Sequence, residues 1–200
     1  MSFNNIVGQE AAVRILQDEL KDGRVQHAYL FSGKRGVGKK ALALELTKAI
    51  FCSEKEIDSC DNCLACRKII HSNHPDTGIY SIEKGNFIKI DQIRKLQKDI
   101  AYKPYESGKK IYIIENADKM TTEAANSLLR TLEEPPGYAI IILLAEEVDR
   151  LLPTIISRCQ QIQLKGIADN TIKQELIKEG IEEKQAALLT RLADGSLGIA

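Results

Sequence analysis

The sequence has no excess of charge of either sign, since 28 Lys and Arg residues balance 28 Asp and Glu residues among 200. A protein that holds DNA or an acidic membrane on its own usually carries a basic surplus, so neither role is expected of this chain alone. The chain also lacks a basic N-terminal segment followed by an apolar one, and it lacks the roughly 20-residue apolar run that spans a bilayer. We therefore expect a cytoplasmic protein without membrane attachment.

The composition that is present is that of an ordinary globular protein. Hydrophobic residues make up 44% and charged residues 28% of the chain, which excludes disordered, collagen-like and purely coiled-coil classes. A length of 200 residues allows one or two domains with a substantial core. The sequence contains no internal repeat and no low-complexity segment.

Apolar runs alternate with helix-period segments over most of the chain. We expect strands at 28–32, 77–82, 87–90, 109–118, 137–147 and 159–164, and helices at 9–21, 41–51, 90–100 (capped by Asp91) and 120–134. This alternation predicts an α/β fold, a parallel sheet with helices on both faces, in a domain of residues 1–164. Two further helices at 169–180 and 181–195 predict a small helical domain over 165–200 that is cut short.

A glycine-rich loop joins the first predicted strand to a predicted helix. Gly33, Gly38 and Lys39, with Gly36 between them, match the first seven positions of the phosphate-binding pattern G-x-x-x-x-G-K-[ST]. In such a loop the backbone N–H groups and the helix N-terminus surround phosphates, and the lysine reaches the outer ones. A turn that only packs is the alternative, but the strand and helix on either side favour a phosphate cradle.

Two positions of this cradle lack the groups that hydrolysis needs. Lys40 occupies the place of the hydroxyl that ligates Mg²⁺, and an ammonium repels that ion. At the end of a later strand Glu115 is placed to hold Mg²⁺, but Asn116 replaces the carboxylate that polarises the attacking water. The alternative for these two residues is a polar cap on the strand. We expect a degenerate site that holds ATP or ADP weakly or not at all.

Arg158 lies in the segment LLPTIISRC at 151–159, between a small polar residue and a cysteine of buried type. Its planar, permanently charged guanidinium suits the charge on a transferring phosphoryl group, and a finger supplied in trans raises rates by roughly 10³–10⁵. A single arginine near a strand is usually a surface charge. The functional interpretation therefore depends on the neighbouring motifs.

Four of the five cysteines crowd between residues 52 and 66, which in a reducing compartment indicates metal or redox chemistry. Cys52, Cys60, Cys63 and Cys66 supply the four thiolates of a closed tetrahedral Zn²⁺ site, and the spacing of the last three fits about one and a half helical turns. An Fe–S cluster or a redox-active thiol pair are the alternatives. We favour structural zinc because Fe–S runs usually place a fourth cysteine downstream, next to proline.

These motifs together resemble the AAA+ subunits of bacterial clamp loaders. The resemblance rests on IVGQE at 6–10, HAYLFSG at 27–33, CDNCLACR at 60–67, NHPD at 73–76, ENADKM at 115–120, AANSLLRTLEEPP at 124–136 and LLPTIISRC at 151–159. It covers essentially the whole chain. It implies a P-loop NTPase-like α/β domain with a zinc module at about 52–66, a helical lid, and a C-terminal collar domain that is missing from this sequence.

The resemblance also implies roles for particular residues. Arg158 would be an arginine finger aimed at ATP on an adjacent motor subunit, and Ile6, Val7 and Gly8 would border an adenine pocket. The family's two nucleotide sensors align near Ala145 and Gly198, neither of which carries a sensing group. The implied partners are the gamma/tau motor and delta subunits in a hetero-pentamer, with the sliding clamp and primed DNA contacted through the complex.

Two functions from different classes follow from these observations. The first is a stator subunit of the DNA polymerase III clamp loader, which has no ATPase activity of its own but belongs to a nucleotidyltransferase complex. The alternative is an active ATPase of the gamma/tau type. Lys40 and Asn116 favour the stator, because hydrolysis needs a Mg²⁺ ligand and a base at those positions. The zero net charge disfavours a third hypothesis, an independent zinc-dependent DNA-binding module.

Overall fold

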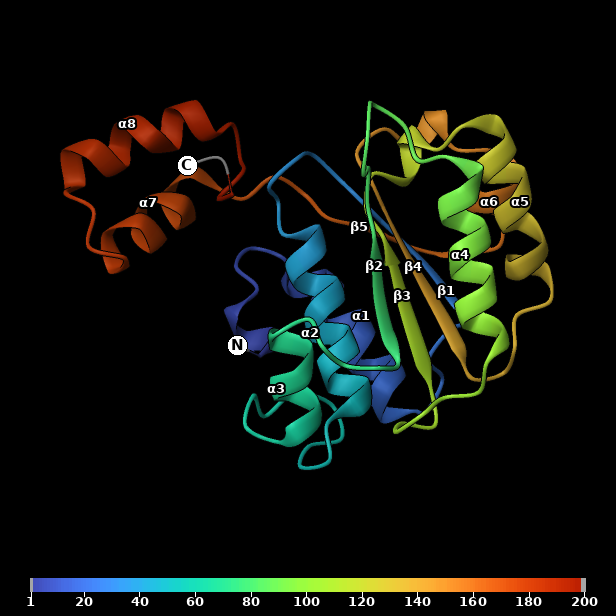
Figure 1. The fold of residues 1–200 in the computed structure, drawn as a ribbon. Coiled ribbons are helices and arrows are strands. Elements are labelled where there is room, and N and C mark those ends of the chain that lie inside the picture. Colours follow the sequence, from blue (N-terminus) through green and yellow to red (C-terminus); the bar gives the residue numbers. More distant parts are fainter. Residues whose placement is uncertain (1, 199–200) are drawn as a thin grey trace.

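A parallel sheet forms the centre of the molecule in the computed structural model, which describes residues 2–198 (Figure 1). Within those residues the sheet has five strands in the order β2-β3-β4-β1-β5. Their bounds are β1 (Ala28–Ser32), β2 (Thr77–Tyr80), β3 (Lys110–Ile114), β4 (Ala139–Ala145) and β5 (Gln160–Gln163). The pairing places Ala28 opposite Ile141 and Tyr29 opposite Gln160, all in parallel register.

Helices cover both faces of this sheet (Figure 1). On one face lie α1 (Glu10–Lys21), α2 (Lys39–Phe51) and α3 (Leu64–Ile70), and on the other lie α4 (Ile90–Ala101), α5 (Thr122–Glu133) and α6 (Pro153–Ile156). Every residue of β3 and β4 is buried, as expected for parallel strands covered on both sides. The predicted fold class, an α/β parallel sheet with helices on both faces, is confirmed.

The strand side chains alternate between two cores. Leu30 and Ile114 join the core under α4 and α5, whereas Phe31 and Ile113 join the core under α1 and α2. Short 3-10 helices connect the elements: η1 (Phe3–Asn5), η2 (Ala117–Lys119) and η3 (Val148–Arg150). None of the helices in residues 2–198 has the length and apolar character needed to cross a membrane.

Two further helices, α7 (Asp169–Lys178) and α8 (Glu183–Ala193), pack on each other apart from the sheet, on the side where α1, α2 and α3 lie (Figure 1). They share a small apolar cluster that includes Ile167, Ile172, Leu176 and Ala186. The cluster is separate from the two cores of the sheet. The pair α7 and α8 therefore has its own apolar cluster, and the segment that follows α8 lies near the glycine-rich loop, as described below.

The start of α4 differs from the sequence prediction. Its N-cap is Lys89, whose backbone N–H donates to the side chain of Gln92 in a capping box, so Asp91 is not the cap. Asp91 lies in the first helical turn instead, where a carboxylate favours the helix dipole. The expected strand at 87–90 is reduced to a single bridge between Ile88 and Met120, because Ile90 already belongs to the helix.

Candidate functional site

The glycine-rich loop connects β1 to α2 at the carboxyl end of the sheet. At Gly33, φ is 149°, and a Cβ would lie 2.5 Å from the carbonyl oxygen of Leu164. Gly38 has φ of 103° and is the N-cap of α2. Only glycine fits both conditions without strain. The loop therefore has the backbone shape of a phosphate cradle, with the positive end of the α2 dipole directed into it.

The loop is covered by the segment that follows α8. The backbone N–H of Gly198 donates to the carbonyl of Gly36 at 3.0 Å. A Cβ on Gly198 would lie only 3.1 Å from the Cα of Gly36, so the two backbones approach closely here. Lys34 Nζ also lies 2.7 Å from a carboxylate oxygen of Asp194. Thus residues 194–198 rest directly on the cradle.

The Lys39 ammonium is folded onto the loop itself. Its Nζ donates to the carbonyls of Gly33 at 2.5 Å and Lys34 at 2.8 Å. Burial lowers the pKa of Lys39, although the negative charges of Glu146 and Asp118 act in the opposite direction. In this arrangement Lys39 stabilises the loop, because two carbonyls of the loop accept hydrogen bonds from its ammonium.

The cleft beside the loop has a volume of about 590 Å³, and it brings together the residues predicted for the nucleotide site. Gly36, Gly38, Lys39, Lys40, Glu115 and Asn116 all line it. Its most informative contact joins Lys40 Nζ to Glu115 Oε1 at 2.7 Å. The Lys40 ammonium, at the position where an active site has a Mg²⁺-binding hydroxyl, is thus paired with the Glu115 carboxylate that was expected to hold Mg²⁺.

Asn116 lies next to this ion pair in the left-handed backbone region, with φ of 55°. Asparagine tolerates that conformation better than most residues. Sequence reasoning missed two acids nearby. Glu146 lines the cleft directly after β4, and Asp118 is buried with Oδ1 accepting from the Glu146 N–H at 3.3 Å. The signal for Glu146 was available, since it is the first charged residue after a buried strand.

A smaller apolar cavity of about 230 Å³ lies on the other side of the loop. Ile6, Val7, Ile167 and Leu197 contribute to its lining. Gly8 does not line it, but a Cβ at Gly8 would lie 2.9 Å from the side chain of Ile167. The structure thus brings two of the three residues that the resemblance assigned to an adenine pocket to one cavity beside the cradle.

Arg158 lies at the opposite end of the sheet from the cradle. It comes two residues before the first residue of β5, Gln160, which pairs with Tyr29 of β1. The cradle begins at Gly33, four residues further along β1, a separation of roughly 13 Å along the strand. The guanidinium is partly exposed and is held by Glu133 and by its own segment. Its position does not allow it to serve the cradle of its own chain.

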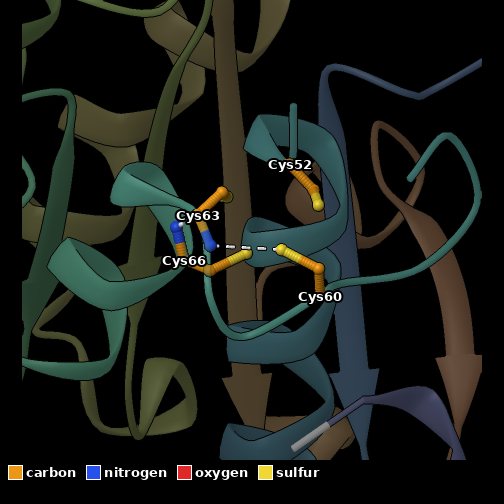
Figure 2. A group of neighbouring side chains, drawn as sticks. All are labelled: Cys52, Cys60, Cys63 and Cys66. Carbon is orange, nitrogen blue, oxygen red and sulfur yellow. Dashed lines mark hydrogen bonds between the residues drawn. The ribbon is translucent and has the colours of Figure 1, made fainter. Parts of the chain in front are cut away.

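The four cysteines of the 52–66 segment come together between the end of α2 and the start of α3 (Figure 2). The sulfur atoms of Cys52, Cys60, Cys63 and Cys66 all lie within 4.8 Å of one another. The N–H of Cys63 donates to Cys60 Sγ at 3.2 Å, and the N–H of Cys66 donates to Cys63 Sγ at 3.5 Å. Such N–H donors favour thiolates, the form that binds metals.

Two of these thiols have pKa values that move in opposite directions. Burial disfavours ionisation of Cys63, but hydrogen bonds from the N–H groups of Cys66 and Ser53 outweigh it and lower its pKa to about 6. Burial, followed by the hydrogen bond to Cys63, raises the pKa of Cys66. Cys159 lies far along the chain in the core under α4 and α5, where burial raises the pKa of its thiol to about 12. Cys159 is therefore a core residue.

The predicted helical placement of the last three cysteines is wrong. Only Cys66 lies within α3, and Cys63 is its N-cap. Between Cys60 and Cys63 the backbone is not helical, because Asp61 has φ of 60°. The Asp61 carboxylate lies 2.6 Å from the buried Lys48 Nζ of α2. This ion pair attaches the cysteine segment to α2.

A Ser-His-Asp arrangement at Ser107, His74 and Asp76 is structural and not catalytic. His74 Nε2 lies 3.2 Å from Ser107 Oγ, but His74 Nδ1 accepts the backbone N–H of Asp76, so in the neutral ring Nε2 carries the proton. It therefore cannot remove a proton from the serine. His74 is buried and stacks on Phe51, with ring centroids 4.8 Å apart. Burial lowers the pKa of His74, which favours this neutral form.

The strand order and the loop after β1 define a P-loop NTPase fold of the AAA+ type, and solved structures agree. A Thermotoga maritima RuvB variant aligns with a TM-score of 0.62 and 15% identity over 98% of this chain and 60% of that chain. A DNA polymerase III gamma subunit-related protein from Thermotoga maritima gives a TM-score of 0.59 and 22% identity over 90% and 58%. At these identities the similarity shows the fold alone.

Sequence comparison is more specific. The family model described as "DNA polymerase III, delta subunit" matches residues 8–168. The Bacillus subtilis DNA polymerase III subunit delta' is 40% identical over 93% of this chain and 56% of that protein, and the Bacillus subtilis subunit tau is 34% identical over 98% and 36%. The chain therefore belongs to the DNA polymerase III delta subunit family. It spans 56% of the length of the delta' relative and 36% of the length of the tau relative.

Proposed function

We propose that the chain is a stator subunit of a DNA polymerase III clamp loader, which completes a neighbour's ATP site instead of hydrolysing ATP itself. It packs beside a gamma/tau-type motor subunit, in a hetero-pentamer that also contains delta, and presents Arg158 to the neighbour's nucleotide. The complex then loads the sliding clamp on primed DNA in the cytoplasm. The observation that carries this proposal is the ion pair between Lys40 and Glu115.

This ion pair supports the loss of hydrolysis on electrostatic grounds. In an active P-loop site, a hydroxyl at the position of Lys40 and an acid near the position of Glu115 hold Mg²⁺ between them. Here an ammonium is 2.7 Å from that acid. The protein therefore already supplies the positive charge that neutralises this carboxylate, and the ammonium repels a metal ion at the same place.

Three other positions support the same proposal. The amide of Asn116 cannot accept the proton of an attacking water. Ala145, near the place of the first sensor, is buried at the end of β4 and has no hydrogen-bonding side chain. Gly198, in the place of the second sensor, contacts Gly36 through its backbone alone. None of the three offers a group that reads or cleaves a γ-phosphate.

Nucleotide binding by the cradle is proposed to be weak or absent. Lys39 is bonded to two carbonyls of its own loop, and the segment 194–198 rests on Gly36. To bind, an ATP or ADP molecule would need to replace the hydrogen bonds of Lys39 and to move the segment 194–198 away from Gly36. The cleft keeps the dimensions of a ligand site, so a residual affinity is compatible with the stator role.

We also propose that the four clustered cysteines hold one structural Zn²⁺. Sulfur atoms bound to one zinc at roughly 2.3 Å lie about 3.8 Å from one another. The observed limit of 4.8 Å is therefore about 1 Å from a closed site, and all four donors come from a segment that has little apolar content. Zinc would fix the 52–66 module against α2, and four thiolates leave no open position for catalysis.

The domain division is part of the proposal as well. Residues 1–164 would be the AAA+ domain and residues 165–200 the start of a helical lid, of which residues 199–200 lie outside the described part. A collar domain would complete the subunit. The separate apolar cluster of α7 and α8 supports this division.

The second candidate function is an active ATPase of the gamma/tau type. The intact glycine loop, the cleft of about 590 Å³ and 34% identity to a tau subunit favour it. It requires Mg²⁺ beside Lys40 and a base at Asn116. We therefore place it second.

Arg158→Ala in a reconstituted clamp loader tests the stator role. We expect the DNA-stimulated ATPase rate at the neighbour's site to fall by at least about 10²-fold while assembly is unchanged, because that site loses its finger. Arg150→Ala is the matched control, since Arg150 is an exposed arginine of η3 that forms an ion pair with Glu147. An unchanged rate, or turnover near 1 s⁻¹ by the isolated chain, would contradict the proposal.

Metal analysis tests the zinc proposal. We expect about one zinc per chain by elemental analysis of the purified protein, and a loss of thermal stability after chelation. Cys159→Ser is the control, since that cysteine lies in the core under α4 and α5, and it should leave the zinc content unchanged. An iron absorption band, or the absence of any metal, would refute the site.

A further inference from the structure

The guanidinium of Arg158 is held at three places. Nη1 donates to the carbonyl of Thr154 at 2.8 Å and to Ser157 Oγ at 3.3 Å. Nη2 lies 2.8 Å from Glu133 Oε1. Of these partners, Glu133 alone comes from another element, because it is the last residue of α5, whereas the other two belong to the segment that contains the arginine.

We propose that Glu133 is the positioning residue of the arginine finger. It holds the guanidinium in one place before the neighbour's nucleotide arrives, and it gives way when a phosphate approaches. This inference rests on the proposed function, because it concerns how the finger is presented. In this role Glu133 acts through Arg158 and does not itself bind the nucleotide.

A tether of this kind needs to be firm enough to restrict the arginine and weak enough to release it. A free arginine loses much rotamer entropy when it is fixed, so prior restriction lowers the cost of placing it. The side chains of Arg158 and Glu133 are 34% and 48% exposed, and an ion pair at such exposure is weak. A polyanionic phosphate therefore competes with Glu133 at little cost.

The contacts also leave the guanidinium partly free. Arginine has five N–H donors, and no acceptor within residues 2–198 takes the Nε–H of Arg158. The backbone contact to Thr154 fixes one side of the fork. An incoming phosphate can bind the free donor first and then replace the carboxylate.

The chain offers a matched control for this inference. Glu134 follows Glu133 directly, is also exposed, and makes no ion pair with any residue of the described part of the chain. Changing either glutamate to glutamine removes one charge from the same surface. A difference between the two variants therefore reports the contact with Arg158 and not the net charge of the interface.

The experiment measures steady-state ATPase of the reconstituted clamp loader containing Glu133→Gln, Glu134→Gln or Glu133→Asp. We expect Glu133→Gln to lower kcat about two- to fivefold with an unchanged KM for ATP, which is the range of a partly exposed ion pair. Glu134→Gln should match the unmodified complex, and Glu133→Asp, which keeps the charge, should recover part of the rate. Size-exclusion chromatography confirms that each complex is assembled.

A double-mutant cycle with Arg158→Ala separates the possible failures. If the tether acts through the arginine, Glu133→Gln has no further effect in that background. An equal loss in both backgrounds, or equal rates for Glu133→Gln and Glu134→Gln, overturns the positioning role while the stator proposal survives. An unchanged rate for Arg158→Ala alone overturns the proposed function itself.

Discussion

Lys40 and Arg158 each have a glutamate partner at nearly the same distance, 2.7 Å and 2.8 Å, yet the two pairs lie in opposite settings. Lys40 is in the first turn of α2, where the helix dipole disfavours a cation, and Glu115 compensates for it. Arg158 is paired with the last residue of α5, where the dipole favours a cation. The first pair thus neutralises a charge inside the cleft, whereas the second restrains a charge at the surface.

The largest effect should come from replacing each of the two cationic side chains by the other type, lysine for arginine or arginine for lysine, which leaves the charge unchanged. Arg158→Lys removes the planar fork, so we expect the ATPase rate at the neighbour's site to fall by about 10²-fold. Lys40→Arg keeps a cation beside Glu115 and should leave that rate nearly unchanged. Single-turnover ATPase of the reconstituted complex measures both. Equal losses in the two variants would contradict the different roles of Lys40 and Arg158.

A third carboxylate differs from Glu115 and Glu133 because its partners are backbone groups. Asp76 is fully buried and accepts the N–H groups of Tyr105 at 2.6 Å, Glu106 at 2.8 Å and Ser107 at 2.9 Å. We expect Asp76→Asn to lower the free energy of unfolding by about 1–3 kcal/mol, since an amide leaves at least one donor unpaired. Urea unfolding measures the loss, and the exposed Asp149→Asn is the control.

The same carboxylate predicts a pH dependence. Burial opposes ionisation of Asp76, but its backbone hydrogen bonds outweigh burial and lower its pKa. A lowered pKa in the folded state contributes stability that is present above the unfolded value of about 3.9 and is lost as pH falls below it. Urea titrations between about pH 3 and 6 should show this loss in the unmodified protein and a smaller one in Asp76→Asn. Identical profiles would contradict this assignment.

The smallest effect should come from removing the ion pair between Lys40 and Glu115 beside the glycine-rich loop. Lys40→Thr replaces the ammonium by a hydroxyl and frees Glu115, so we expect ATP to bind at least about tenfold more tightly in Mg²⁺ than in EDTA. Lys119→Thr removes another cation that lines the cleft without placing a hydroxyl at the metal position, and it should show no such Mg²⁺ dependence. Isothermal titration calorimetry measures both. Equal affinities with and without Mg²⁺ in Lys40→Thr would show that the ion pair is not what excludes the metal.

Most of the fold was predictable because its signals are local. The apolar runs of β3 and β4, the strand-loop-helix pattern around Gly33 and the period of α5 follow from residues close in sequence. The start of α4 was not, since its cap depends on the side chain of Gln92 reaching back to Lys89. The turn between Cys60 and Cys63 was missed because it depends on the contact of Asp61 with Lys48, thirteen residues away.

The predicted nucleotide site shows the same division. Residue types alone indicated that Lys40 and Asn116 lack the groups for hydrolysis. That Lys40 binds Glu115 was not visible, because the two residues are far apart in sequence and meet only where β1 and β3 end at the same edge of the sheet. The acids Glu146 and Asp118 and the tether at Glu133 depend on similar meetings.

Thus the order of residues was sufficient for the class of fold, the glycine loop, the four thiols and the identity of the candidate finger, since each depends on side-chain chemistry and short-range spacing. The partners of the charges could not be read in this way. Which carboxylate faces Lys40, which holds Arg158 and which backbone donors surround Asp76 were settled by packing, because a Coulomb interaction or a hydrogen bond depends on distance in space and not on distance along the chain.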